Sequence, residues 1–138
     1  MEPAFTILDH TADVGLRVRG ATLAELFGNA ARGMFTLLCD PTTVHPRERV
    51  AVAIEEDDLA YLLHDWLKEL LYIVDTRRML FARFEADITA GRLDGAAWGE
   101  PLEPARHEIK TEIKAVTCHG LEVRRRHGHW TAQVIFDL

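Results

Sequence analysis

Cysteine is scarce in this sequence. Only Cys39 and Cys118 occur, far apart and without a CxxC pair. A disulfide framework or a four-sulfur zinc site needs more cysteines at closer spacing, so neither fits this chain. We expect two reduced, packed thiols.

Long apolar runs and targeting signals are also missing. No stretch approaches the roughly 20 apolar residues that a membrane-spanning helix needs. The opening residues, MEPAFTILDH, lack a basic segment followed by an apolar one. We therefore expect a cytoplasmic protein that makes no membrane contact.

Positive charge is in deficit, with 16 Lys and Arg residues against 22 Asp and Glu residues and a net charge of -6. Affinity for nucleic acid comes largely from neutralising phosphates with Lys and Arg. The balance therefore argues against a surface built to hold phosphate backbones, although a local basic patch stays open. A chain of 138 residues that is 48% hydrophobic is typical of one globular domain, here residues 1–138.

Familiar catalytic motifs are absent as well. The sequence has no GxSxG elbow, no GxxxxGK[ST] phosphate loop, no HExxH and no GxGxxG. No combination of nucleophile and base emerges, and we predict that the protein is not an enzyme.

Two segments show the three- and four-residue apolar spacing of amphipathic helices. The first follows a capping box formed by Thr22 and Glu25 and ends before Pro41. The second follows the acidic residues 55–58, which suit a helix N-terminus, and is the strongest helix pattern in the chain. We interpret its Trp66, and Phe27 and Met34 of the first helix, as core residues.

About seven strands accompany these helices. The last five, at 80–88, 92–97, 107–115, 121–123 and 130–136, follow one another without an intervening helix. This order predicts an α+β fold, a single-domain sandwich of mostly antiparallel strands with two main helices.

Acidic residues gather in one turn and at the chain end. Residues 9–13 (DHTAD) lie between two predicted strands, where short carboxylates can converge on a cation. Aspartate is also common in turns for backbone reasons alone. At the other end, Asp137 and the terminal carboxylate of Leu138 place two negative groups side by side. Either a cation offsets them or the end is simply solvated.

One basic run, residues 124–127 (RRRH), stands out in this acidic chain. It fits contact with an acidic partner or RNA, but also a solvated edge strand whose charges block aggregation. We interpret His127 and Gly128 as a hairpin turn rather than part of a metal site. Lys110 and Lys114 lie on the polar side of a predicted strand, facing either a cleft or plain solvent.

Four stretches together resemble the archease family: residues 9–16 (DHTADVGL), 66–72 (WLKELLY), 112–117 (EIKAVT) and 134–138 (VIFDL). Their order, spacing and the chain length all fit. The resemblance implies an α+β fold and a protein cofactor of the GTP-dependent RNA ligase that joins a 2′,3′-cyclic phosphate or 3′-phosphate end to a 5′-hydroxyl end in tRNA splicing and RNA repair. It implies that the protein promotes ligase guanylylation and multiple turnover.

The resemblance also implies site residues. A divalent metal, calcium in the family, with manganese or magnesium as alternatives, would be bound by Asp13, Asp137 and the carboxylate of Leu138. Lys114 and His10 would serve ligase activation. The partner would be the RNA-splicing ligase, with RNA contacted only indirectly or weakly. Two alternatives stay open: a chaperone-like modulator of tRNA-modifying enzymes such as a tRNA methyltransferase, and a metal-dependent hydrolase using the same acidic cluster.

Overall fold

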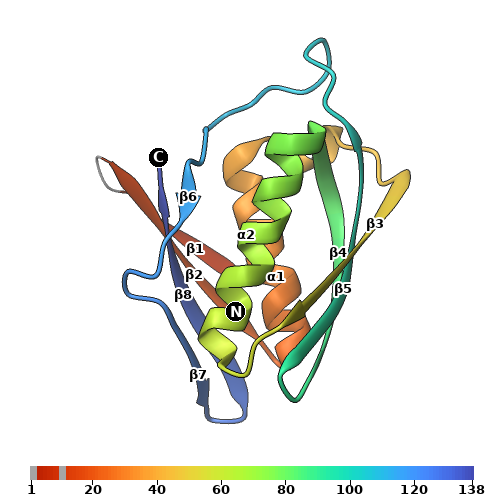
Figure 1. The fold of residues 1–138 in the computed structure, drawn as a ribbon. Helices are drawn as coiled ribbons and strands as arrows, with labels where there is room; N and C mark the ends of the chain where they lie inside the picture. The colour runs from red at the N-terminus through yellow and green to blue at the C-terminus, as the bar shows by residue number, and fades with distance from the viewer. Residues whose placement is uncertain (1–2, 10–11) are drawn as a thin grey trace.

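The computed structural model describes residues 3–9 and 12–138. It confirms the predicted α+β class, because two helices lie between two antiparallel sheets (Figure 1). The helices are α1 (Leu23–Leu38) and α2 (Leu59–Arg77), and a 3-10 turn, η1, spans Pro41–Thr43. The five-stranded sheet comprises β1 (Phe5–Asp9), β2 (Asp13–Gly20), β6 (Ala115–Val116), β7 (Glu122–Arg126) and β8 (His129–Asp137). The three-stranded sheet comprises β3 (Glu48–Glu55), β4 (Met79–Thr89) and β5 (Arg92–Pro101).

Strand β8 is the centre of the five-stranded sheet. One of its edges pairs with β2, which in turn pairs with β1, and all these pairings are antiparallel. Both β6 and β7 pair with the other edge of β8, β6 near its end and β7 along its first half. Strands β1 and β8 therefore lie in one sheet, and the start of β2 lies beside the end of β8.

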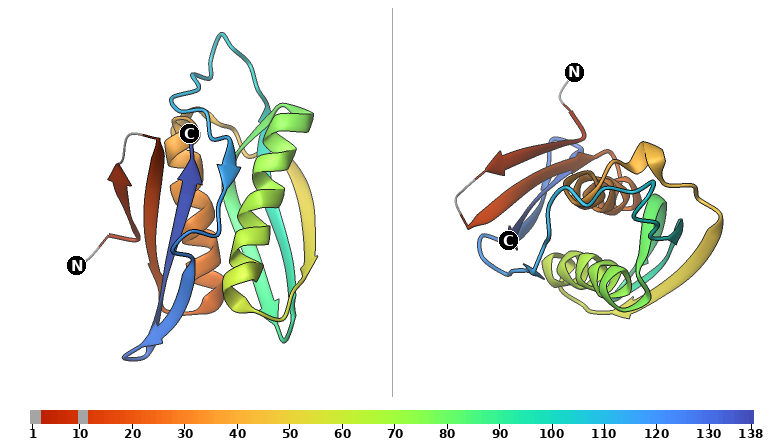
Figure 2. Two further views of the ribbon diagram at one scale, coloured as in Figure 1. Left: turned by 60° about the vertical axis from the view of Figure 1, so that its left-hand side comes forward. Right: turned by 90° about the horizontal axis from the view of Figure 1, so that it is seen from above.

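The core fills the space between the sheets, where both helices lie (Figure 2). Phe27, Met34 and Trp66 are fully buried, which confirms that the helix stripes are core. The Trp66 indole N–H donates to the carbonyl of Phe27 at 3.1 Å and so ties α2 to α1. A Cβ added at Gly95 would lie 2.9 Å from the Trp66 ring, so glycine makes room for the indole. Within the described residues, neither helix is long and apolar enough to cross a membrane.

Helix α2 begins where the acidic run predicted it. The Asp58 carboxylate accepts hydrogen bonds from the backbone N–H groups of Ala60 (2.9 Å) and Tyr61 (3.1 Å). Replacing Asp58 with alanine leaves both donors without this partner, so we expect a loss of about 1 kcal/mol in the free energy of unfolding. Asp57→Ala removes an equal charge one residue earlier, outside the cap. It should lower the free energy of unfolding by less, as measured by chemical denaturation. Equal losses in the two variants would contradict the capping role.

The strand predicted at residues 107–115 is wrong except at its end. Only Ala115 and Val116 form a strand, and Ile109, expected on the buried face, is 42% exposed. Residues 102–114 instead form a long connection from the three-stranded to the five-stranded sheet (Figure 1). Hydrogen bonds to the end of α1 replace a ladder here, since the Lys110 N–H donates to the carbonyl of Leu38 and its ammonium to that of Thr36. Apolar alternation alone did not distinguish this segment from a strand.

The two cysteines are free, but only one is packed. Cys39 is buried at the end of α1, and its burial raises the pKa of the thiol to about 11. Cys118 is exposed, which corrects the expectation of two packed thiols. Its position in the loop between β6 and β7 explains the exposure.

Candidate functional site

Asp13 and Asp137 form a cross-strand pair. Asp13 opens β2, Asp137 ends β8, and the antiparallel register places them directly opposite each other. Side chains in such a pair share one face, with Cβ atoms about 4.5–5.5 Å apart. The next pair, Val14 and Phe136, is buried and faces the helices, so the two aspartates are on the outer face of the sheet. Residues from opposite ends of the sequence therefore meet in one place.

Main-chain hydrogen bonds hold both flanks of this pair. The N–H of Leu138 donates to the carbonyl of Ala12 at 3.1 Å, so the pairing of β8 with the start of β2 continues to residue 138. On the other side, the N–H of Lys114 donates to the carbonyl of Asp137 at 2.8 Å. The predicted residues Asp13, Lys114, Asp137 and Leu138 thus gather at one end of the sheet. The contact of Lys114 is made by its backbone, and its side chain is exposed.

The donor set at this end consists of hard oxygen atoms, the ligands that calcium, magnesium and manganese prefer. Two carboxylates come from the side chains of Asp13 and Asp137, and Leu138 follows directly after β8. No group of three His, Cys, Asp or Glu side chains in residues 3–9 and 12–138 is placed to hold a metal ion. A cation here would thus need ligands beyond the two aspartate side chains. His10, predicted to act in ligase activation, lies outside the described residues.

A second cross-strand aspartate pair offers a comparison. Asp87 and Asp94 are opposite each other on β4 and β5. There the Arg92 guanidinium binds both oxygens of Asp94, at 2.9 and 3.0 Å, and these hydrogen bonds lower the pKa of that carboxyl. In the described part of the chain, neither Asp13 nor Asp137 has an ion pair with an arginine or lysine. The two aspartate pairs therefore differ: Asp94 has an arginine partner, and Asp13 and Asp137 have none among the described residues.

The basic run lies on an exposed hairpin at the opposite end of the same sheet. Strand β7 pairs with β8 through Arg126 and His129, and the turn between them is formed by His127 (φ 47°) and Gly128 (φ 81°). Positive φ at both central residues is the requirement of a tight hairpin turn, so the predicted turn is confirmed. The run is solvated and on an edge strand, as one of the alternatives anticipated.

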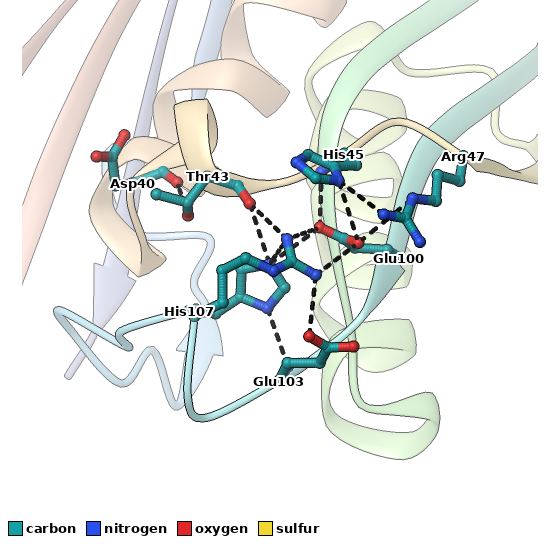
Figure 3. A network of polar contacts seen from close by, with 8 residues as sticks. Asp40, Thr43, His45, Arg47, Glu100, Glu103 and His107 are labelled. Carbon is teal, nitrogen blue, oxygen red and sulfur yellow. Dashed lines mark hydrogen bonds and ion pairs between the residues drawn. The ribbon is translucent and has the colours of Figure 1, made fainter.

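Sequence reasoning missed a polar cluster around Glu100, at the end of β5 (Figure 3). Glu100 is only 2% exposed. Its carboxylate accepts hydrogen bonds from both terminal nitrogens of Arg106, at 2.6 and 3.0 Å, and from the N–H of His45 at 2.7 Å. The buried ring of His107 lies 3.0 Å from the same carboxylate. The cluster anchors the start of the connection 102–114 against β5 and the loop before β3.

The protonation states of this cluster follow from its contacts. Hydrogen bonds from Arg106, then from the His45 N–H and His107, hold the pKa of the Glu100 carboxyl far below its usual range, although its desolvation acts in the opposite direction. The Glu100 carboxylate in turn raises the pKa of Arg106. The Nδ1 atom of His107 accepts from the N–H of Glu103 at 2.9 Å. The neutral ring therefore carries its proton on Nε2, which faces the Glu100 carboxylate.

The missed cluster carried only a weak sequence signal. Arg106 and His107 are adjacent, six and seven residues after Glu100, in a segment that contains Pro101 and Pro104. Those prolines disfavour continuation of a strand beyond residue 101, where β5 ends. The sequence pattern does not show which carboxylate Arg106 pairs with, because that depends on the path of the connection 102–114.

Comparison with known proteins is consistent across sequence and structure. The profile of the Archease protein family matches residues 5–138. The sequence is 40% identical over 135 residues to "Protein archease" of Methanopyrus kandleri, covering 95% of this chain and 96% of that protein. It is 41% identical over 138 residues to "Protein archease" of Methanothermobacter thermautotrophicus, covering 97% and 98%.

Two solved structures have the same fold. The solution structure of protein 1598 of Methanobacterium thermoautotrophicum has a TM-score of 0.88 and 40% identity, covering 98% of this chain and 99% of that one. The crystal structure described as "an archease, possible chaperone" from Thermotoga maritima has a TM-score of 0.66 and 19% identity, covering 100% and 97%. The latter likeness is one of fold alone.

Proposed function

Because this chain belongs to the archease family, we propose that it activates the GTP-dependent RNA ligase that joins a 2′,3′-cyclic phosphate or 3′-phosphate end to a 5′-hydroxyl end. It would promote guanylylation of the ligase's own histidine and so permit multiple turnover in tRNA splicing and RNA repair. The observation that carries the proposal is the cross-strand pairing of Asp13 with Asp137 on an outer sheet face. We call this end of the sheet, marked by Asp13 and Asp137, the metal tip. It would enter the active site of the ligase.

In this proposal Asp13, Asp137 and the carboxylate of Leu138 bind one divalent cation, calcium or one of the similarly hard ions manganese and magnesium. A bound cation would supply positive charge for carboxylate and phosphate oxygens. The chain's own residues position it. Pairing of β2 with β8 fixes the two aspartates, and the hydrogen bond from Leu138 to Ala12 orients the chain end. The exposed ammonium of Lys114, with His10, would face the nucleotide of the ligase.

The protein would assist this chemistry without a catalytic site of its own. Its partner is the ligase, and RNA would be met through the ligase rather than through this tip, because paired carboxylates repel phosphates. A cytoplasmic location fits this role.

The proposal predicts that Asp13→Asn and Asp137→Asn each abolish stimulation of the ligase, because either change removes a charged metal ligand. Guanylylation and multiple-turnover ligation by the cognate ligase are measured with each variant, and calcium binding by calorimetry. Asp87→Asn is the matched control, since it changes an aspartate of the other cross-strand pair, and should keep full stimulation. A variant extended by several residues beyond Leu138 should also lose activity if that carboxylate is a ligand.

Unchanged multiple-turnover ligation with Asp13→Asn and Asp137→Asn would overturn the proposal. Should those variants instead protect a tRNA methyltransferase from aggregation as well as the unmodified protein does, the chaperone-like alternative would be favoured. Chelator-sensitive release of product from generic phosphoesters by the protein alone would favour the hydrolase. Thermal melts establish that each variant is folded.

A further inference from the structure

The outer face of the five-stranded sheet carries its charges at opposite ends. The carboxylates of Asp13 and Asp137 occupy one end, and arginines of β2 and β7 occupy the other. Along β2 the distance from residue 13 to residue 19 is about 20 Å at the usual rise per residue. The basic end is therefore a surface distinct from the proposed metal tip.

Four arginines lie on the two sides of this basic end: Arg17 and Arg19 on β2, and Arg124 and Arg126 on β7. The register aligns Arg17 with Gln133 and Gln133 with Glu122, and in the next row it aligns Arg19 with Thr131 and Thr131 with Arg124. Strand β8 thus separates the arginines of β2 from those of β7. Two strand spacings amount to about 10 Å. The result is a trough with arginines on both sides and an uncharged floor, and Glu122 shares the β7 side.

The trough is a real depression, a groove of about 570 Å³. Its charged lining residues are Arg17, Arg19, Glu122 and Arg126, and Thr131 and Gln133 lie on its floor. Hydroxyl and amide groups on the floor are donors for phosphate and sugar oxygens, as guanidinium groups on the sides are for phosphates. We name this surface the arginine trough.

The arginine trough keeps a surplus of positive charge. Glu122 pairs with Arg124 at 3.2 Å. Arg17 contacts only the amide oxygen of Gln133, at 3.5 Å, and within the described residues neither Arg17 nor Arg126 has a carboxylate partner. Protection of a sheet edge explains arginines on β7. It does not explain Arg17, because β2 is an interior strand between β1 and β8.

We propose that the arginine trough binds the phosphodiester backbone of a single-stranded nucleic acid. Arg17 and Arg126 lie on opposite sides of the groove, and among the described residues neither has a carboxylate partner. Two such cations along one groove suit the successive phosphates of an extended backbone. A trough two strand spacings wide admits one strand rather than a duplex. No aromatic side chain is among its lining residues, so binding should be independent of base sequence.

This inference does not rest on the proposed function, since Asp13 and Asp137 take no part in it. Fluorescence anisotropy with short single-stranded RNA and DNA oligonucleotides of the same sequence tests it on the full chain. Each phosphate contact contributes about 0.7 to the slope of log affinity against log salt for single strands. The double variant Arg17→Gln/Arg126→Gln should therefore bind more weakly and lose about 1.4 from that slope.

The matched control is Arg49→Gln/Arg83→Gln, which removes two exposed arginines from the outer face of the other sheet. It should bind like the unmodified protein. Absence of oligonucleotide binding at low salt, or equal losses in both double variants, would overturn the proposal. Displacement of the oligonucleotide by polyglutamate at equal charge concentration would show that the trough recognises acidic protein instead. Preference for RNA over DNA would identify a contribution from the 2′-hydroxyl group.

Discussion

Glu100→Ala should destabilise the protein about as much as removal of a large core side chain does. The variant leaves the Arg106 guanidinium without its buried partner and the fully buried ring of His107 facing an empty site. Removing the buried member of an ion pair is more costly than removing an exposed one, because the remaining Arg106 side chain, 31% exposed, stays partly desolvated. Chemical denaturation followed by circular dichroism measures the loss, and the denaturation midpoint should fall strongly.

Glu103→Ala is the matched control for this variant. Glu103 also pairs with Arg106, at 3.1 Å, but its side chain is 62% exposed. Exposed pairs contribute little, so this change should be nearly neutral. Comparable midpoints for the two variants would show that the buried carboxylate does not anchor the connection 102–114.

The same carboxylate gives the protein a pH dependence of known sign. The pKa of Glu100 is lowered in the folded state, chiefly by Arg106, from a usual value of 4.5. The unfolded chain therefore binds more protons near that pH, and the stabilisation by the carboxylate is complete above pH 4.5 and is lost as the pH falls below it. The difference in unfolding free energy between the unmodified protein and Glu100→Gln should narrow from pH 6 to pH 3. A constant difference would contradict the depressed pKa.

Trp66→Ala should cost about 3–5 kcal/mol of unfolding free energy. The indole is fully buried between the two helices and the three-stranded sheet, against Gly95. Truncation removes this apolar surface, leaves a cavity and breaks the hydrogen bond to the Phe27 carbonyl. Denaturant unfolding in parallel with the unmodified protein measures the change.

Two further variants separate the contributions of this tryptophan. Trp66→Phe keeps most of the buried ring but removes the indole donor, so it should cost less than Trp66→Ala. Tyr72→Ala, on the same helix but 60% exposed, should change stability by less than about 0.5 kcal/mol. A Trp66→Ala variant as stable as Tyr72→Ala would mean that the helices are not joined through the indole.

Local patterns predicted the two helices and the hairpin turn, but not the course of residues 107–114. Helices α1 and α2 follow from apolar spacing, from the capping box at Thr22 and from the acidic residues 55–58, and the hairpin at His127 and Gly128 follows from turn chemistry. Each depends on neighbours within a few residues, which is the range that periodicity and capping describe. The fold class followed because element order constrains how layers can pack.

Long-range pairing could not be predicted in the same way. Nothing local indicates that Asp13 is opposite Asp137, because that depends on the register of two strands at opposite ends of the chain. Resemblance to the archease family, rather than periodicity, indicated that these residues share a site. The trough also escaped notice, since Arg17 and Arg126 come to line one groove only when β8 lies between their strands. Glu100 and His107 were missed for the same reason.

The central position of β8 also determines when during synthesis the sheet can form. Strands β1 and β2 emerge from the ribosome first, yet β2 has no partner on its second edge until β8 has been made. The three-stranded sheet, whose strands are nearer in sequence, can assemble earlier, since pairings close in sequence form faster. During that interval the apolar side of β2, with Val14, Leu16 and Val18, lacks half of its sheet. A newly made chain thus carries an open strand edge until its final strand arrives, and this is the stage at which it is most prone to pair wrongly with another copy.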